Sequence, residues 1–150
     1  MKSVKALTTL GLFLLLAAPG LHAVCSNATA AGTYAFTTTG TLILPTGAAP
    51  VAAVGLITFQ LNGNTTGSQD RSVGAVFAHE TITGSLTVNH DCTSLLLANV
   101  YDTSGNLVRI STISAVFVNN GRLIRGVFES VTLPDGTALP AILTVDANRM

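Results

Sequence analysis

Three charged residues of this chain could form a polar site. Glu80 has the same parity as Ile82 and Leu86, so in an extended strand its side chain points to the same side as theirs. Arg125 and Glu129 share one face of a second, largely apolar segment. A carboxylate and a guanidinium that meet in an apolar enclosure can orient a small ligand, or act as acid and base in an isomerase or cyclase. We take Glu80, Arg125 and Glu129 as candidate ligand-binding residues and assign no catalytic residue.

The sequence leaves open which face of the second segment points inward. Both faces carry apolar residues: Leu123, Val127 and Val131 accompany the two charges, and Ile124 and Phe128 occupy the other face. If the first face is inward, Arg125 and Glu129 are buried and must pair, because a charge removed from water without a partner is costly. If that face is outward, they form an exposed pair that contributes little to stability.

The patterns of metal, cofactor and nucleophile sites do not occur. His79-Glu80 and His90-Asp91 carry ligand types, but the two pairs lie at opposite ends of one predicted strand, about 36 Å apart, and cannot hold one ion. Asp70-Arg71 is predicted to be an exposed pair at a polar strand end. There is no Gly-x-Ser-x-Gly elbow, phosphate-binding glycine loop or zinc spacing. We therefore predict no metal and no cofactor.

The first residues of the chain have the organisation of a secretory signal peptide. Lys2 and Lys5 precede an apolar run from Leu7 to Ala18, and Pro19-Gly20 interrupts it before Ala23. The run is too short, and wrongly flanked, for a membrane-spanning helix. We predict cleavage after Ala23, which leaves residues 24–150 as a single domain.

Composition restricts the partners and the compartment. Only 9% of the residues are charged, and acidic and basic residues balance, so no basic stripe exists for a nucleic acid. Cys25 and Cys92 are the only cysteines, and an even count in an exported chain predicts a disulfide. Closing that loop would stabilise the fold by about 4 kcal/mol on the chain-entropy model. The protein is predicted to be secreted or periplasmic.

Alternation of apolar and polar residues predicts a chain made of β-strands. In the stretch from His79 to Cys92, threonine and serine occupy one face and aliphatic residues the other. Asn62-Gly63-Asn64 and Asn119-Asn120-Gly121 are hairpin turns, Gly74 is a candidate bulge, and Pro140 weakens the last strand. Besides the strand in that stretch, the predicted strands are Gly32–Leu44, Val51–Leu61 after a loop at Pro45–Pro50, Thr65–Ala78, Thr93–Tyr101, Leu107–Val118, Arg122–Thr132 and Thr137–Val145.

Eight strands joined mostly by short turns predict an antiparallel up-and-down β-barrel, since closure removes exposed edges. A two-sheet β-sandwich is the alternative. A membrane-spanning barrel would carry aromatic girdles, whereas this chain has no Trp and has Tyr only at positions 34 and 101. We therefore predict that the exported protein does not span a membrane.

Several glycine, aromatic and turn motifs carry a resemblance to known proteins. They are Gly32–Phe36 with Gly40, Gly55–Phe59 with Asn62–Asn64 and Gly67, and Thr83–Asn89 with Asp91–Thr93. In these motifs the chain resembles a group of small exported bacterial proteins of unassigned function. More distantly, its plan is similar to the barrels of the allene oxide cyclase and dirigent type and to calycins. This resemblance implies a barrel that binds or steers a small apolar molecule, and none of those families' catalytic residues matches a position here.

The sequence leaves three hypotheses of function. The first is an exported barrel that binds a small apolar molecule or a partner in the cell envelope. The second is a structural or interaction protein of the envelope. The third is an isomerase or cyclase that uses Glu80, Arg125 or Glu129. The sequence fixes neither the ligand nor the oligomeric state.

Overall fold

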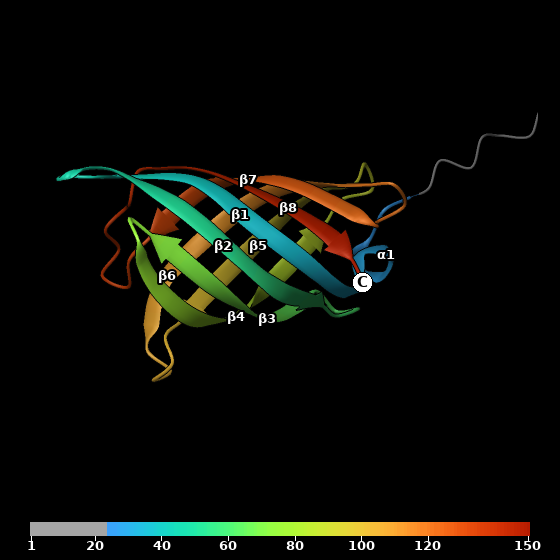
Figure 1. Ribbon diagram of the computed structural model, residues 1–150. Helices are drawn as coiled ribbons and strands as arrows, with labels where there is room; N and C mark the ends of the chain where they lie inside the picture. The colour runs from blue at the N-terminus through green and yellow to red at the C-terminus, as the bar shows by residue number, and fades with distance from the viewer. Residues whose placement is uncertain (1–23) are drawn as a thin grey trace, which may run out of the picture.

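Eight antiparallel strands close into a barrel in up-and-down order, which confirms the predicted fold and excludes the sandwich (Figure 1). The structure, a computed structural model, describes residues 24–150, so the predicted signal peptide lies outside the described residues. The elements are α1 (Asn27–Ala30), β1 (Gly32–Leu44), β2 (Gly47–Phe59), β3 (Asn64–Val73), β4 (Val76–Val88), β5 (Thr93–Tyr101), β6 (Leu107–Val118), β7 (Leu123–Thr132) and β8 (Ala141–Arg149).

Each strand pairs with its neighbours in the chain, and β1 pairs with β8 to complete the ring. The pairing of β1 with β2 is the longest, from Gly32 opposite Phe59 to Leu44 opposite Gly47. The pairing of β7 with β8 is much shorter, from Leu123 opposite Asn148 to Val127 opposite Thr144. Among residues 24–150, no helix has the length and apolar character needed to cross a membrane.

The hairpin between β3 and β4 corrects one predicted strand. Thr65–Ala78 was expected to be continuous with a bulge at Gly74, but the chain turns there instead. Gly74 and Ala75 have φ of 53° and 70°, which is the left-handed backbone of a tight hairpin turn. The turn was missed because alanine rarely adopts this conformation.

Replacing Ala75 with glycine is expected to raise the free energy of unfolding by about 1 kcal/mol, because glycine carries no Cβ that clashes at positive φ. The same substitution at Ala48, an exposed position in the extended backbone of β2, should lower it by about 0.5–1 kcal/mol. Urea unfolding of the two variants checks the prediction. Effects of the same sign would contradict it.

Two further boundaries differ from the prediction, and both involve proline. The expected loop Pro45–Pro50 is mostly strand, since β2 begins at Gly47 and Pro50 lies opposite Thr41. The expected strand Thr137–Val145 is shifted: β8 begins after Pro140 and runs on to Arg149. Pro140 lacks an N–H for the ladder, but its carbonyl accepts a hydrogen bond of 2.8 Å from the Ile43 N–H. β8 is therefore a paired wall strand and not an edge.

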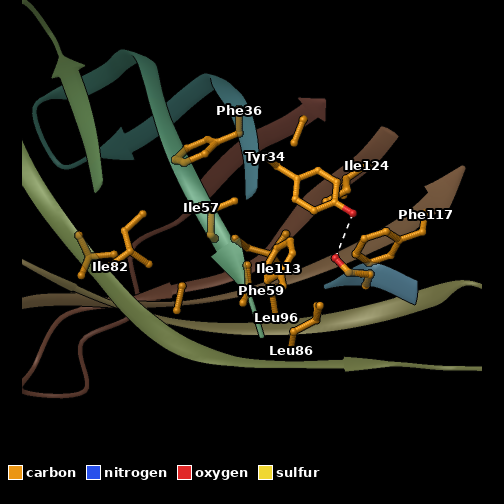
Figure 2. Packing of buried hydrophobic residues seen from close by; sticks show 14 residues of the cluster. Tyr34, Phe36, Ile57, Phe59, Ile82, Leu86, Leu96, Ile113, Phe117 and Ile124 are labelled. Carbon is orange, nitrogen blue, oxygen red and sulfur yellow. Dashed lines mark hydrogen bonds between the residues drawn. The ribbon is translucent and has the colours of Figure 1, made fainter. Parts of the chain in front are cut away.

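Aromatic side chains close one end of the barrel (Figure 2). The Tyr34 ring lies 5.4 Å from that of Phe59 and 6.2 Å from that of Phe117. The Tyr34 hydroxyl shares its single proton between two carbonyl acceptors, that of Ala30, in the short helix α1, at 3.0 Å and that of Gly121 at 2.6 Å. Burial raises the pKa of Tyr34, and Arg149 opposes this, so the phenol stays protonated and able to donate. We call this end, with α1 across it, the floor.

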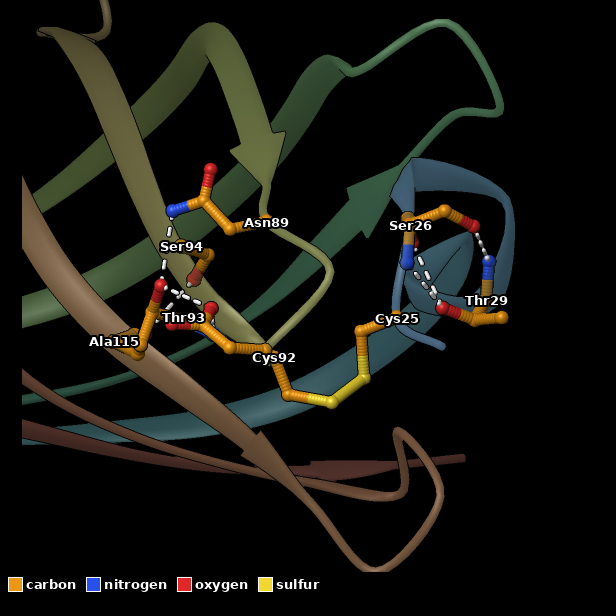
Figure 3. The surroundings of a disulfide bond; sticks show 9 residues. Cys25, Ser26, Thr29, Asn89, Cys92, Thr93, Ser94 and Ala115 are labelled. Atoms are coloured by element: carbon orange, nitrogen blue, oxygen red, sulfur yellow. Dashed lines mark hydrogen bonds between the residues drawn. A yellow bond between two sulfur atoms is a disulfide. The ribbon is translucent and has the colours of Figure 1, made fainter. Parts of the chain in front are cut away.

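A disulfide between Cys25 and Cys92, as predicted, ties the chain ahead of α1 to the β4–β5 hairpin at the floor (Figure 3). The two Cα atoms are 4.9 Å apart. Cys92 has a φ of 71°. In this hairpin the Asn89 N–H donates to the Thr93 carbonyl at 2.8 Å and the Cys92 N–H to the Asn89 carbonyl at 3.0 Å. The hairpins after β5 and β7 make the same pair of bonds, with Gly105 and Gly136 at the position of Cys92.

Candidate ligand-binding site in the barrel lumen

Glu80 points into the lumen, as its parity with Ile82 and Leu86 predicts. Its side chain is 2% exposed, and all three of these β4 residues are buried. A carboxylate can be held in such a place only if its oxygens are paired with donors. Two neighbouring arginines and a glutamine supply those donors.

Arg109 forms a bidentate ion pair with Glu80. Its Nη1 donates to Oε1 and its Nη2 to Oε2, both at 2.7 Å. Arg71 approaches from the side, with Nε at 3.0 Å and Nη2 at 2.8 Å from Oε1. Gln69 Nε2 donates to Oε2 at 2.7 Å. Charge-assisted contacts of this bidentate kind are the strong ones, so the carboxylate is held from three directions.

Strand register brings these four side chains together. Gln69 on β3 lies directly opposite Glu80 on β4. Arg71 is two residues further along the same face of β3. Arg109 comes from β6, across β5, where it lies opposite Val100. The cluster Gln69, Arg71, Glu80 and Arg109, called the lumen cluster below, thus joins three strands near the end of the barrel away from the floor.

The lumen cluster keeps Glu80 ionised. Burial alone would raise the pKa of this carboxyl, but the hydrogen bonds from Arg109 and Arg71, the charge of Arg109 and the Gln69 bond lower it from 4.5 to about 2. A group with such a low pKa carries no proton to give at neutral pH and is a weak base. Glu80 therefore serves to neutralise and position arginines, and it is poorly suited to acid–base catalysis.

This low pKa makes stability depend on pH in acid. The pKa of Glu80 is about 2 in the folded protein and lies below the ordinary 4.5, so the folded state favours the ionised carboxylate. The resulting stability is fully present above pH 4.5 and is lost as the pH falls towards 2. We expect the free energy of unfolding to drop by about 3 kcal/mol over this range from Glu80 alone. Urea unfolding between pH 6 and 2 measures it.

Exposed turn carboxylates add to the same acid loss, so Glu80 must be isolated by difference. Asp91, Asp102 and Asp135 also have lowered pKa values, through hydrogen bonds within their own turns. These contributions are the same in the wild type and in Glu80→Gln, so they cancel in the difference between the two free energies of unfolding. This difference should narrow as the pH approaches 2, and a difference that stays constant would contradict the assigned pKa.

The two arginines keep donors to spare. A guanidinium has five N–H groups, and Arg71 and Arg109 each use two of them on Glu80. Their side chains are 23% and 16% exposed, so the remaining N–H groups lie at the border between lumen and solvent. With one glutamate against two arginines, the cluster has a net charge of +1.

A cavity of about 210 Å³ lies in the lumen beside the cluster. Its wall is mainly aliphatic and aromatic, and Phe59 and Phe117 line it towards the floor. Arg71 and Arg109 line it as well, whereas Glu80 lies behind them, outside the lining. Ser111 is a further polar lining residue, and its buried hydroxyl has no hydrogen-bond partner in the described part of the chain.

Arg125 and Glu129 lie on the outer surface of β7 and take no part in the lumen. Arg125 faces Asp146 at 3.9 Å, and Glu129 accepts a hydrogen bond from Ser114. The inward face is that of Ile124 and Phe128. Because Glu129 is an extra residue opposite the step from Thr112 to Ile113, the parity of β7 changes there and Val131 also turns inward. This change of parity accounts for Val131, whereas Val127 is an exposed apolar residue of the outer wall.

Glu80 is thus separated from Arg125 and Glu129 by the barrel wall. The isomerase or cyclase hypothesis required these groups to converge, and they do not. Among residues 24–150, no group of three His, Cys, Asp or Glu side chains could hold a metal ion. The site offers guanidinium, amide and hydroxyl donors around an apolar space.

The predicted exposed pair Asp70-Arg71 was half wrong. Asp70 is exposed and contacts His79 Nδ1 at 2.7 Å, but Arg71 turns inward to Glu80. Adjacent residues of a strand point to opposite faces, which was a usable signal for separating them. Arg109 was overlooked, although it has the parity of Ile113 and Phe117, both buried. Its parity therefore places Arg109 in the lumen.

The fold and the site together define a closed eight-stranded barrel with a charged cluster set in an apolar lumen. Models of protein families, curated proteins and solved structures give no match to this chain. The resemblance to exported bacterial barrels therefore stays a prediction, and the geometry of the lumen is the basis for a proposal about function.

Proposed function

We propose that this protein binds a small, mainly apolar molecule inside its barrel. The observation that carries the proposal is the cavity of about 210 Å³, whose apolar wall holds a few convergent polar groups. Such a combination is the usual form of a small-molecule site. A dry cavity of about 150 Å³ is large enough to bind benzene, so this lumen has room for a ring with substituents.

We also propose that the protein works outside the cytoplasm, secreted or in the periplasm. The disulfide Cys25–Cys92 supports this, because structural disulfides persist in oxidising compartments. The alternative is a structural role, or binding to a partner, in the cell envelope.

Titration with indole, a neutral ring compound, tests lumen binding. We expect saturable one-to-one binding, followed by two-dimensional NMR of backbone amides, with shifts concentrated at strand residues that line the cavity. Ala53→Leu should weaken binding at least tenfold, because Ala53 lines the cavity and the larger side chain fills it.

Ala52→Leu is the matched control, because Ala52 is the neighbouring residue on the outer face of β2. It makes the same change in size without entering the lumen, so indole affinity should stay as in the wild type. Equal weakening by both variants, or the absence of saturable binding, would contradict a lumen site.

A further inference from the structure

We propose that the bound molecule carries one carboxylate, which contacts Arg71 and Arg109 while its apolar part fills the cavity towards the floor. This inference rests on the proposed function and specifies its ligand as a small aromatic or short aliphatic carboxylate. Three observations support it: the charge presented to the cavity, the free donors of the arginines and the unpartnered hydroxyl of Ser111.

The charge that the cavity presents is positive. Among the described residues that line it, Arg71 and Arg109 are the only charged ones. Glu80 compensates one positive charge from behind them, which leaves one uncompensated. In a partly buried site an unbalanced charge is screened less than at the surface. A ligand with a single negative charge balances it, whereas a cation is repelled.

The geometry of the donors suits a carboxylate. Planar guanidinium groups match carboxylate oxygens in paired contacts. Four hydrogen bonds to Glu80 fix the orientation of the two arginines, and a fifth, from Gln69, holds the Glu80 carboxylate in place. Because the arginines are already held in place, a second carboxylate can bind to their remaining N–H groups with little further ordering.

Ser111 supplies a separate indication of a polar ligand atom. Its side chain is 2% exposed, and its Oγ has no partner in the described structure. Buried hydroxyls are nearly always hydrogen-bonded, so this one has a donor available for a molecule in the cavity. Ser111 lies two residues from Arg109 on the same strand face, about 7 Å along β6, which is within reach of one bound anion.

The size of the cavity limits the ligand. By proportion to the benzene-sized cavity, 210 Å³ accepts about eight to ten non-hydrogen atoms. Phenylacetate fits this limit, and phenylacetamide has the same shape without the charge. Phenethylamine is a cation of similar size. These three compounds separate charge recognition from apolar burial.

Calorimetric titration of the full folded chain with the three compounds at pH 7 is the test. Phenylacetate is expected to bind at least tenfold more tightly than phenylacetamide, and phenethylamine more weakly than both. Ser111→Ala should weaken phenylacetate severalfold without lowering the unfolding midpoint, because the free protein loses no hydrogen bond. Unchanged phenylacetate affinity in that variant would overturn the part assigned to Ser111.

Variants of the cluster assign the preference to its arginines. Arg109→Met removes the uncompensated charge, so the ratio of phenylacetate to phenylacetamide affinity should fall to about one while amide binding persists. If this variant does not fold, the triple variant Arg71→Met, Glu80→Leu, Arg109→Met replaces the whole ionic group by apolar side chains, a change that buried ion clusters often tolerate. Arg125→Met, on the outer wall, is the control and should keep the wild-type ratio.

Each pattern of results has one meaning. Equal affinity for phenylacetate and phenylacetamide, with phenylacetamide bound in the lumen, would overturn the carboxylate inference and leave the proposed function standing. No binding of any of the three compounds or of indole would overturn both. A tenfold preference that survives in Arg109→Met, or in the triple variant where Arg109→Met does not fold, would place anion recognition elsewhere and overturn the inference.

Discussion

Glu80→Gln is expected to lower the free energy of unfolding at pH 7 by about 3 kcal/mol. The substitution keeps the shape of the side chain but removes its charge, so Arg71 and Arg109 are left facing each other in the lumen without an anion. Breaking a buried ion pair in this way typically costs about 3–5 kcal/mol. We expect the lower end because the arginines are 23% and 16% exposed and keep some contact with water.

The control for this variant is Glu129→Gln, the same chemical change on the outer wall. Glu129 is exposed, and its loss should change the free energy of unfolding by less than about 0.5 kcal/mol. Chemical unfolding followed by circular dichroism compares the two variants. A loss below 1 kcal/mol for Glu80→Gln would show that the lumen cluster does not depend on its carboxylate.

Removing the disulfide is expected to cost about 4 kcal/mol in the double variant Cys25→Ser, Cys92→Ser. The bond joins residues 67 apart, so its loss releases a long loop in the unfolded chain. Reduction of the wild type should produce a loss of similar size. Chemical unfolding with and without reductant measures both, and an undiminished stability would contradict the stabilising role.

A second double variant separates the crosslink from the backbone of the turn. Cys92 has a φ of 71°, where the equivalent hairpin positions carry Gly105 and Gly136. A non-glycine residue in this conformation costs about 1 kcal/mol. Cys25→Ser, Cys92→Gly should therefore be about 1 kcal/mol more stable than the double serine variant. Equal stability of the two variants would contradict this account of the turn.

The fold could be predicted because its determinants are local. Alternation places Ile82 and Leu86 inward without reference to any other strand. The site could be predicted only in part, since its members come from β3, β4 and β6 and meet through register. Glu80 was found by parity. Arg71, between Asp70 and Ser72, resembles a solvated strand end, whereas Arg109 was missed although its parity with Ile113 and Phe117 points inward.

Two further errors of the prediction trace to single irregular residues. The extra residue Glu129 changes the phase of β7, and no pattern in the surrounding sequence marks it. The turn at Gly74-Ala75 places an alanine where glycine or asparagine is expected. Such features depend on the pairing of neighbouring strands, which a reading of one segment at a time does not contain.

The short pairing of β7 with β8 leaves part of the barrel wall closed by a loop and not by paired strands. Beyond Val127 the two strands separate, and the loop between them returns to β7 through the Leu139 N–H, which donates to the Val131 carbonyl at 2.8 Å. Leu133 and Leu139 of this loop cover the gap and line the cavity. The loop thus joins β7 and β8 where the two strands are not paired with each other. If the lumen binds a small molecule as proposed, we expect that molecule to exchange with solvent past this loop and not through the aromatic floor.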